Sequence, residues 1–141
     1  MIIKGVRNPM FILISVFISF IGTHSFHRMQ ETSYQPIENA LLEEDAEALS
    51  LLFAPQLELT IKDNADFAIR SSYSSKDGKQ VLTNFFEQYE VSDFEVSHVG
   101  TSHEINYIIG FLDTDKGKFR VLIRYGLNEE KIEINEIEFV L

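Results

Sequence analysis

The feature that most constrains this chain is a two-residue alternation of apolar and polar side chains through nearly all of residues 94–141. Successive side chains of a β-strand point to opposite faces of the sheet, so this period is typical of strands with one buried face. Turn-forming stretches interrupt the alternation at residues 100–103, 115–117 and 128–130. The pattern predicts four consecutive antiparallel strands joined by hairpins.

The phase of the alternation predicts which side chains of these strands face the core. Ile108 and Leu122 have the opposite phase and are expected on the outer face. The residues expected to face inward are Phe94, Val96, His98, Ile105, Tyr107, Ile109, Phe111, Phe119, Val121, Ile123, Tyr125 and Leu127.

The last of these strands has a break in its phase. Ile134 belongs to one face, whereas Ile137 and Phe139 belong to the other. A strand without a local irregularity would leave half of these apolar side chains facing water. The break therefore predicts a β-bulge near Asn135 and Glu136.

A helix is expected immediately before the four strands, over residues 76–89. Ser74, followed three residues later by Asp77, resembles a capping box at the start of a helix. Apolar side chains then recur at helical spacing. They are Val81, Leu82, Phe85, Phe86 and Tyr89.

Shorter elements are expected nearer the N-terminus. Alternating side chains around a turn-like stretch at 62–66 predict a strand pair over 57–61 and 67–73. Two short helices are expected before this pair. Asp45 is a good N-cap for the second helix, and Pro55 closes it.

The N-terminal segment has the pattern of a secretory signal peptide. Lys4 and Arg7 precede the uncharged, mostly apolar residues 10–22. This run is shorter than the roughly 20 apolar residues that a membrane-spanning helix needs. We therefore expect a signal peptide over residues 1–25 and a flexible lead over residues 26–35, with an uncleaved anchor as the alternative.

Composition limits the compartment and the partners. The chain has 22 acidic and 12 basic side chains, no cysteine and a pI near 4.8. Loss of residues 1–25 would remove two basic side chains and no acidic one, leaving a charge of −12. This acidity argues against nucleic-acid binding, and the lack of cysteine excludes disulfides and a lipoprotein anchor. We expect an exported protein, periplasmic or extracellular in a Gram-negative bacterium, that meets the membrane only during export.

The order of the expected elements resembles that of the nuclear-transport-factor-2-like superfamily. Four stretches carry a closer resemblance to a family of exported bacterial proteins known as domain of unknown function number 4783. They are "ALSLLF" at 48–53, "LELTI" at 57–61, "VLTNFF" at 81–86 and "GKFRVLIRY" at 117–125.

The resemblance implies a single α+β domain over residues 36–141, of the nuclear-transport-factor-2-like or cystatin-like class. In that fold a cone-like, curved antiparallel sheet wraps around a long helix. The resemblance carries no catalytic residue to this chain. This chain departs from the superfamily pattern at Glu44, where members often have glycine.

The resemblance also implies a pocket at the open end of the cone. Strand phase gives five polar side chains that would face it: Ser71, Tyr73, His98, Tyr107 and Tyr125. We predict a binding site lined by the last four. The alternative for each tyrosine is a core position with its hydroxyl at the rim, and for His98 a hydrogen-bonded position at a strand end.

The sequence offers little support for catalysis. A steroid-processing isomerase of this superfamily pairs an inward carboxylate base with a tyrosine. Here the inward positions of the four C-terminal strands hold no carboxylate before Asp113. An isomerase- or hydrolase-like enzyme would have to use His98 as its base, with Tyr107 or Tyr125, and this is kept as an alternative.

No metal or cofactor site is expected. The acidic run at residues 43–47 lacks the alternating ligands and glycine of a calcium loop and fits a solvated helix face. The stretch "DTDKG" at 113–117 is better explained as a hairpin turn.

Charged residues on the outer face of the sheet allow two interpretations. Lys118, Arg120 and Arg124 lie opposite glutamates of the last strand and are expected to form cross-strand ion pairs. With Ile108 and Leu122 exposed, the same face would suit a homodimer interface.

Together these patterns predict an exported, non-catalytic binding or accessory domain. We expect it to have a pocket for a small hydrophobic or polar ligand and to form a homodimer through the sheet face. A structural or assembly protein acting through its sheet face is the second alternative to this expectation. It predicts a pocket filled by phenylalanines, namely Phe85, Phe86, Phe111 and Phe119.

Overall fold

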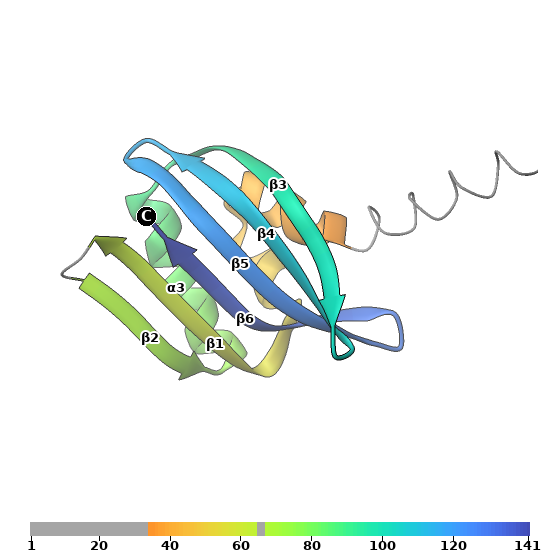
Figure 1. Cartoon of the computed structure of the whole chain (residues 1–141). Helices are drawn as coiled ribbons and strands as arrows, with labels where there is room; N and C mark the ends of the chain where they lie inside the picture. Colours follow the sequence, from red (N-terminus) through yellow and green to blue (C-terminus); the bar gives the residue numbers. More distant parts are fainter. Residues whose placement is uncertain (1–33, 65–66) are drawn as a thin grey trace, which may run out of the picture. The chain divides into compact units, whose positions relative to one another are not determined.

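The four alternating segments form consecutive antiparallel strands in the computed structural model, which describes residues 34–64 and 67–141 (Figure 1). The predicted signal peptide and residues 26–33 of the predicted lead lie outside the described residues. The four strands are β3 (Val91–Ser102), β4 (Ile105–Thr114), β5 (Gly117–Asn128) and β6 (Lys131–Val140).

Two further strands complete one sheet with the order β2-β1-β6-β5-β4-β3. They are β1 (Phe53–Asn64) and β2 (Phe67–Tyr73), which form the predicted antiparallel pair. β1 also lies parallel to β6, so the sheet is mixed rather than purely antiparallel. This parallel pair joins strands that are far apart in the sequence, and local patterns do not predict it.

The short helices differ from expectation mainly in where they end. Residues 34–42 are helical, and α2 (Ala46–Ser50) follows. Asp45 caps α2 as predicted, because its Oδ1 accepts a hydrogen bond from the Ala48 amide at 2.9 Å. The helix ends earlier than predicted because β1 already begins at Phe53.

The turn between the two short helices places Glu44 in the left-handed region, with φ of 55°. This conformation favours glycine, the residue that the resemblance to the superfamily implies at this position. The Glu44 carboxylate accepts a hydrogen bond from the backbone amide of Val91 at the start of β3. Glu44 thus ties the N-terminal turn to the sheet.

The predicted main helix is α3 (Ser75–Gln88), which lies across one face of the sheet (Figure 1). Its start agrees with the sequence signal, since the Ser74 hydroxyl oxygen accepts a hydrogen bond from the Asp77 amide at 3.3 Å. Leu82 and Phe85 are buried between helix and sheet, with exposures of 0% and 3%. A curved, open sheet packed on helices confirms the predicted α+β class, and residues 36–141 form one compact unit. Within the described residues, no helix is long and apolar enough to cross a membrane.

The predicted bulge in β6 is confirmed. Arg124 of β5 pairs with Glu136, whereas the next residue, Tyr125, pairs with Ile134, so Asn135 is extra. This change of register lets Ile134 and Ile137 both face the core, where each is fully buried.

The predicted phase of β4 is wrong. Ile108 and Leu112 face the core, with exposures of 1% and 0%, whereas Ile105 and Phe111 are 42% and 36% exposed. Both phases of β4 are apolar, so the pattern did not decide between them. The tight hairpin to β5 did, because it pairs Leu112 with the buried Phe119.

Of the expected ion pairs on the outer face of the sheet, those of Arg120 and Arg124 are present, whereas Lys118 pairs with a residue of β4 and not with a glutamate of β6. The guanidinium of Arg120 lies 3.3 Å from the Glu138 carboxylate, and that of Arg124 lies 3.1 Å from Glu136. Lys118 pairs with Asp113 at 3.3 Å. All three cations are more than half exposed, so each pair contributes on the order of 0–1 kcal/mol.

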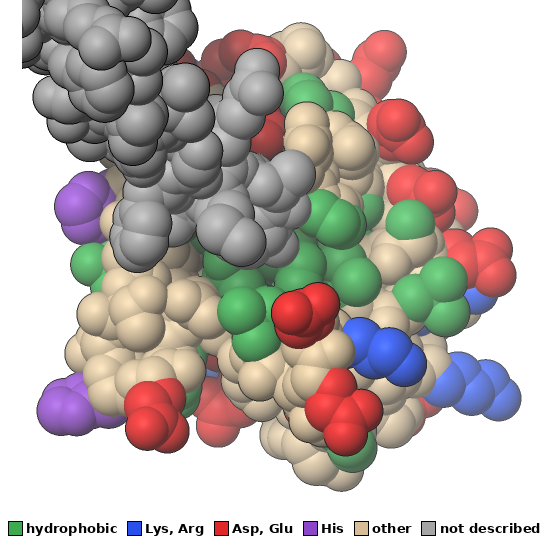
Figure 2. Space-filling model, turned by 90° about the vertical axis from the view of Figure 1, so that its right-hand side faces the viewer, with side chains coloured by type: hydrophobic (Ala, Val, Ile, Leu, Met, Phe, Trp, Pro, Cys, Tyr) green, Lys and Arg blue, Asp and Glu red, His purple; other side chains and the backbone are tan. Residues whose placement is uncertain are grey.

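On the side of the molecule drawn in Figure 2, acidic side chains lie around a group of hydrophobic ones.

Two hairpins contain residues in the left-handed region. His103 and Glu104 have φ of 50° and 66°, and Glu129 and Glu130 repeat these values. Two successive positive φ angles characterise the type I′ turn, which Asn-Gly adopts with less strain than Glu-Glu.

Replacing Glu129-Glu130 with Asn-Gly should therefore stabilise the protein by about 1 kcal/mol. Urea unfolding of the two proteins would measure the difference. The same replacement at Asp115-Lys116 is the control and should not stabilise. Neither residue has a positive φ, and the Asp115 carboxylate accepts a hydrogen bond from the Glu90 amide. Equal effects in the two hairpins would contradict the prediction.

Candidate functional site

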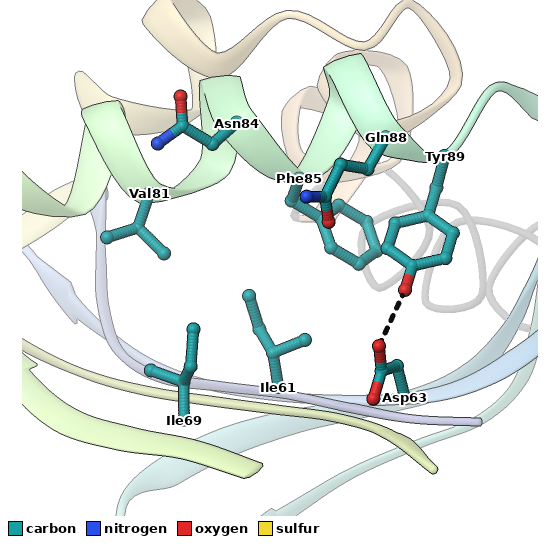
Figure 3. Close-up of a pocket in the computed structure, with 8 residues that line it drawn as sticks. All are labelled: Ile61, Asp63, Ile69, Val81, Asn84, Phe85, Gln88 and Tyr89. Carbon is teal, nitrogen blue, oxygen red and sulfur yellow. Dashed lines mark hydrogen bonds between the residues drawn. The ribbon is translucent and has the colours of Figure 1, made fainter. Parts of the chain in front are cut away.

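A hollow of about 400 Å³ lies between α3 and strands β1 and β2 (Figure 3). Val81 points from the helix toward Ile69 and Ile61 on the strands, and these side chains form an apolar wall. Polar groups contribute the rest of the lining. The full lining consists of Ile61, Asp63, Ile69, Val81, Asn84, Phe85, Gln88 and Tyr89.

Local periodicity explains how these residues meet. Ile61 and Asp63 are two apart on β1 and so point to the same face, and Ile69 lies opposite Ile61 in the register with β2. On α3 the lining residues follow helical spacing, from Val81 to Tyr89. One face of each element therefore supplies its part of the lining.

Asp63 and Tyr89 form a hydrogen-bonded pair at one end of the hollow. The Tyr89 hydroxyl donates to Asp63 Oδ2 at 3.1 Å (Figure 3). The other carboxylate oxygen, Oδ1, is buried and has no hydrogen-bond partner among the described residues. Tyr89 is 7% exposed, and the ammonium of Lys116 lies 5.3 Å from the centre of its ring.

The surroundings of Tyr89 raise the pKa of its hydroxyl above the ordinary value of 10.0. Burial is the largest cause, because it disfavours the phenolate. The hydrogen bond to Asp63 and the negative charge of that carboxylate act in the same direction. Tyr89 is therefore held as a neutral donor.

This arrangement can bind a donor more readily than it can catalyse a reaction. Among the described lining residues Asp63 is the only carboxylate, and one of its oxygens is already bonded to the Tyr89 hydroxyl. Among the described residues, no three His, Cys, Asp or Glu side chains are grouped closely enough to hold a metal ion.

Of the tyrosines predicted to line the pocket, two face inward. Tyr125 is 1% exposed and belongs to the core. Tyr73 lies opposite Leu57, on the core side of the edge strand β2, and is half-buried. Ser71 shares that side but is exposed. None of the three lines the hollow beside α3.

The inward orientation predicted for His98 and Tyr107 is wrong. A register shift between Val96 and His98 in β3 turns His98 to the outer face. Tyr107 lies opposite the outward-facing Arg124 and therefore shares that face.

His98 and Tyr107 do lie together on the outer face. Their ring centres are 5.8 Å apart, and both line a second hollow of about 550 Å³. Tyr107 lies over the backbone of Gly100, where a Cβ atom would come within 2.3 Å of its hydroxyl. No hydrogen bond joins His98 and Tyr107 in the described structure, so the geometry required for a His–Tyr catalytic pair is not present. Whether either residue binds a ligand stays a prediction.

Sequence reasoning missed Asp63 and Tyr89 as a pair. The local pattern predicts a turn over residues 62–66 and a core position of the helix for Tyr89. The alternation of Leu59 and Ile61 could have been extended one step further, to Asp63. That step places a carboxylate on the inner face of β1.

The raised pKa of Tyr89 predicts a specific loss of stability in alkali. Below pH 10 the neutral phenol is present in both folded and unfolded chains. Above pH 10 the unfolded chain loses its proton first, so the stabilisation disappears as pH rises, by up to about 1.4 kcal/mol per pH unit. Urea unfolding between pH 9 and 11 should show a steeper decline for the wild type than for Tyr89→Phe. The decline for Asp63→Asn should lie between those of the other two proteins. Identical pH profiles for all three would contradict the raised pKa of Tyr89.

Comparisons with known proteins agree on the fold. Residues 34–139 match the family described as "Domain of unknown function (DUF4783)". A DUF4783 family protein from Bacteroides uniformis ATCC 8492 is 23% identical, with a TM-score of 0.66 over 75% of this chain and 94% of that one. A second, from Bacteroides fragilis YCH46, is 25% identical, with a TM-score of 0.66 over 74% and 94% of the two chains.

A more distant structure extends the likeness beyond this family. An NTF-2 like protein of unknown function from Silicibacter pomeroyi DSS-3 is 14% identical, with a TM-score of 0.59 over 82% of this chain and 96% of that one. No curated protein matches the chain. The family match covers most of the chain, which therefore belongs to the DUF4783 family and has a nuclear-transport-factor-2-like fold.

Proposed function

We propose that the protein is an exported, non-catalytic binding domain whose hollow beside α3 takes a small ligand with an apolar body. The hollow itself carries the proposal. It measures about 400 Å³, and a mainly apolar lining ends in a few polar groups. Small-molecule sites in proteins have this size and composition. Export is supported by the charged and apolar pattern of the first 25 residues.

The aromatic side chains of the core do not fill the hollow between α3 and the β1–β2 pair. Phe85 and Phe119 fill the middle of the face, with ring centres 5.3 Å apart. Phe111, one of the four phenylalanines expected to fill a pocket in an assembly protein, lies on the outer face instead. The space between α3 and the β1–β2 pair is lined by smaller side chains such as Val81 and Ile69.

The neutral, apolar fluorophore N-phenyl-1-naphthylamine tests the hollow directly. Its fluorescence should rise saturably with the wild type, and Val81→Phe should weaken its binding about tenfold or more by filling the space. Val140→Phe is the matched control, because Val140 is half-buried and lies outside the lining. The proposal fails if the fluorophore does not bind, or if both variants bind it as the wild type does.

We also propose that the outer face of the sheet associates with a second copy of the chain. The support is a run of apolar side chains along β4, from Ile105 to Phe111, that the sheet leaves exposed or half-buried. On the neighbouring strand β3, Glu95 lies opposite Phe111 and His98 lies opposite Ile109. A second copy laid antiparallel on the run would bury the exposed apolar side chains of both copies.

Light scattering at micromolar concentration should accordingly give the mass of a dimer. Phe111→Glu should produce a monomer, because it places a charge within the apolar run. Leu127→Glu is the control, since Leu127 is 51% exposed but has the strand phase of the buried Tyr125 and so belongs to the opposite face of the sheet. A monomeric wild type would disprove the interface.

A further inference from the structure

The Asp63 carboxylate has more acceptor capacity than the protein uses. A carboxylate offers about four acceptor positions on its two oxygens. Oδ2 accepts the Tyr89 hydroxyl at 3.1 Å, and Oδ1 has no partner among the described residues. Buried polar atoms are nearly always hydrogen-bonded, so an oxygen of this kind requires an explanation.

Among the described residues, no positive side chain lines the hollow to compensate this carboxylate. Its other polar lining groups, Asn84, Gln88 and Tyr89, are neutral. The ammonium of Lys116 lies over the Tyr89 ring and donates a hydrogen bond to the Gln88 carbonyl oxygen at 2.6 Å. No ion pair joins Lys116 to Asp63 in the described part of the chain. The hollow therefore has an apolar body and one uncompensated negative end.

We infer that the hollow selects ligands with a protonated amine, whose ammonium group bonds to Asp63 while its apolar part lies against Val81, Ile61 and Ile69. This inference rests on the proposed function and names the ligand class. The ammonium has three donors and no acceptor, which suits a carboxylate with free acceptor positions. Oδ2, which accepts the Tyr89 hydroxyl, keeps a second acceptor position for this ammonium.

Tyr89 and Phe85 have supporting parts in this recognition. The Tyr89 hydroxyl holds the carboxylate at the end of the hollow, so Tyr89 is a positioning residue for Asp63. The rings of Phe85 and Tyr89, whose centres lie 4.9 Å apart, form an aromatic wall beside it. An ammonium near such a wall gains additional attraction from the ring faces. A carboxylate ligand would instead meet the negative charge of Asp63.

Displacement of the bound fluorophore by three six-carbon compounds tests the inference. The probes are n-hexylamine, 1-hexanol and hexanoate, which share an alkyl chain and differ in the head group. The protein purified as the cell makes it is used at about 0.15 M salt, where distant surface charges are largely screened. Hexylamine should bind at least about tenfold more tightly than hexanol, and hexanoate most weakly.

Two variants assign the preference to Asp63. Asp63→Asn keeps the size of the side chain but removes its charge, and should bind hexylamine and hexanol almost equally. Glu87→Gln is the matched control, because Glu87 is an exposed acid on α3 outside the lining, and should keep the full preference. The wild-type ranking needs no variant, so it tests the inference even if Asp63→Asn does not fold.

The failures of the inference and of the proposed function are distinguishable. Fluorophore binding without an amine preference overturns the amine inference and leaves the binding function in place. An amine preference that survives in Asp63→Asn also overturns it. If the fluorophore does not bind the wild type, both proposals fail.

Discussion

The structure depends on the packing of one aromatic side chain, Phe85, against the concave face of the sheet. Its ring stacks on Phe139 with centres 4.5 Å apart and meets Phe119 edge-on at 5.3 Å. A chain without cysteine has no disulfide to hold its helix on the sheet, so buried apolar area must do so. The sheet can surround α3 only because it curves. The bulge at Asn135 allows part of this curvature while keeping both halves of β6 facing the core.

The candidate site begins where this aromatic packing ends. β1 and β2 continue past the cluster, and the side chains that they present to α3 are smaller, such as Ile61 and Ile69. Asp63 lies next to the last residue of β1, at one end of the hollow. The fold thus produces an apolar hollow and places a carboxylate at its edge, and both features follow from how far β1 extends beyond the main core.

The sequence predicted the helices, strands and turns well, but it predicted less well which face of the sheet each side chain occupies. The cap at Ser74 and the bulge at Asn135 are encoded by short patterns and were both found. The orientation of His98 was predicted wrongly, because a bulge in β3 shifts the alternation of side chains between the two faces without a visible break in the apolar pattern. Of the four predicted binding residues, Tyr107 also faces outward, and the pair beside α3 was missed because Asp63 and Tyr89 are 26 residues apart.

By itself the sequence determined the number and order of the strands, the main helix and the hairpins, because each depends on contacts within a few residues. Tertiary structure decided the rest. It placed β1 beside β6 in parallel, and it selected Ile108 and Leu112 rather than the equally apolar opposite phase of β4 as core. It also brought the Asp63 carboxylate to the Tyr89 hydroxyl. The physical reason is the same in each case: pairing register and helix position are set by burial across the whole sheet, which no short stretch of sequence specifies.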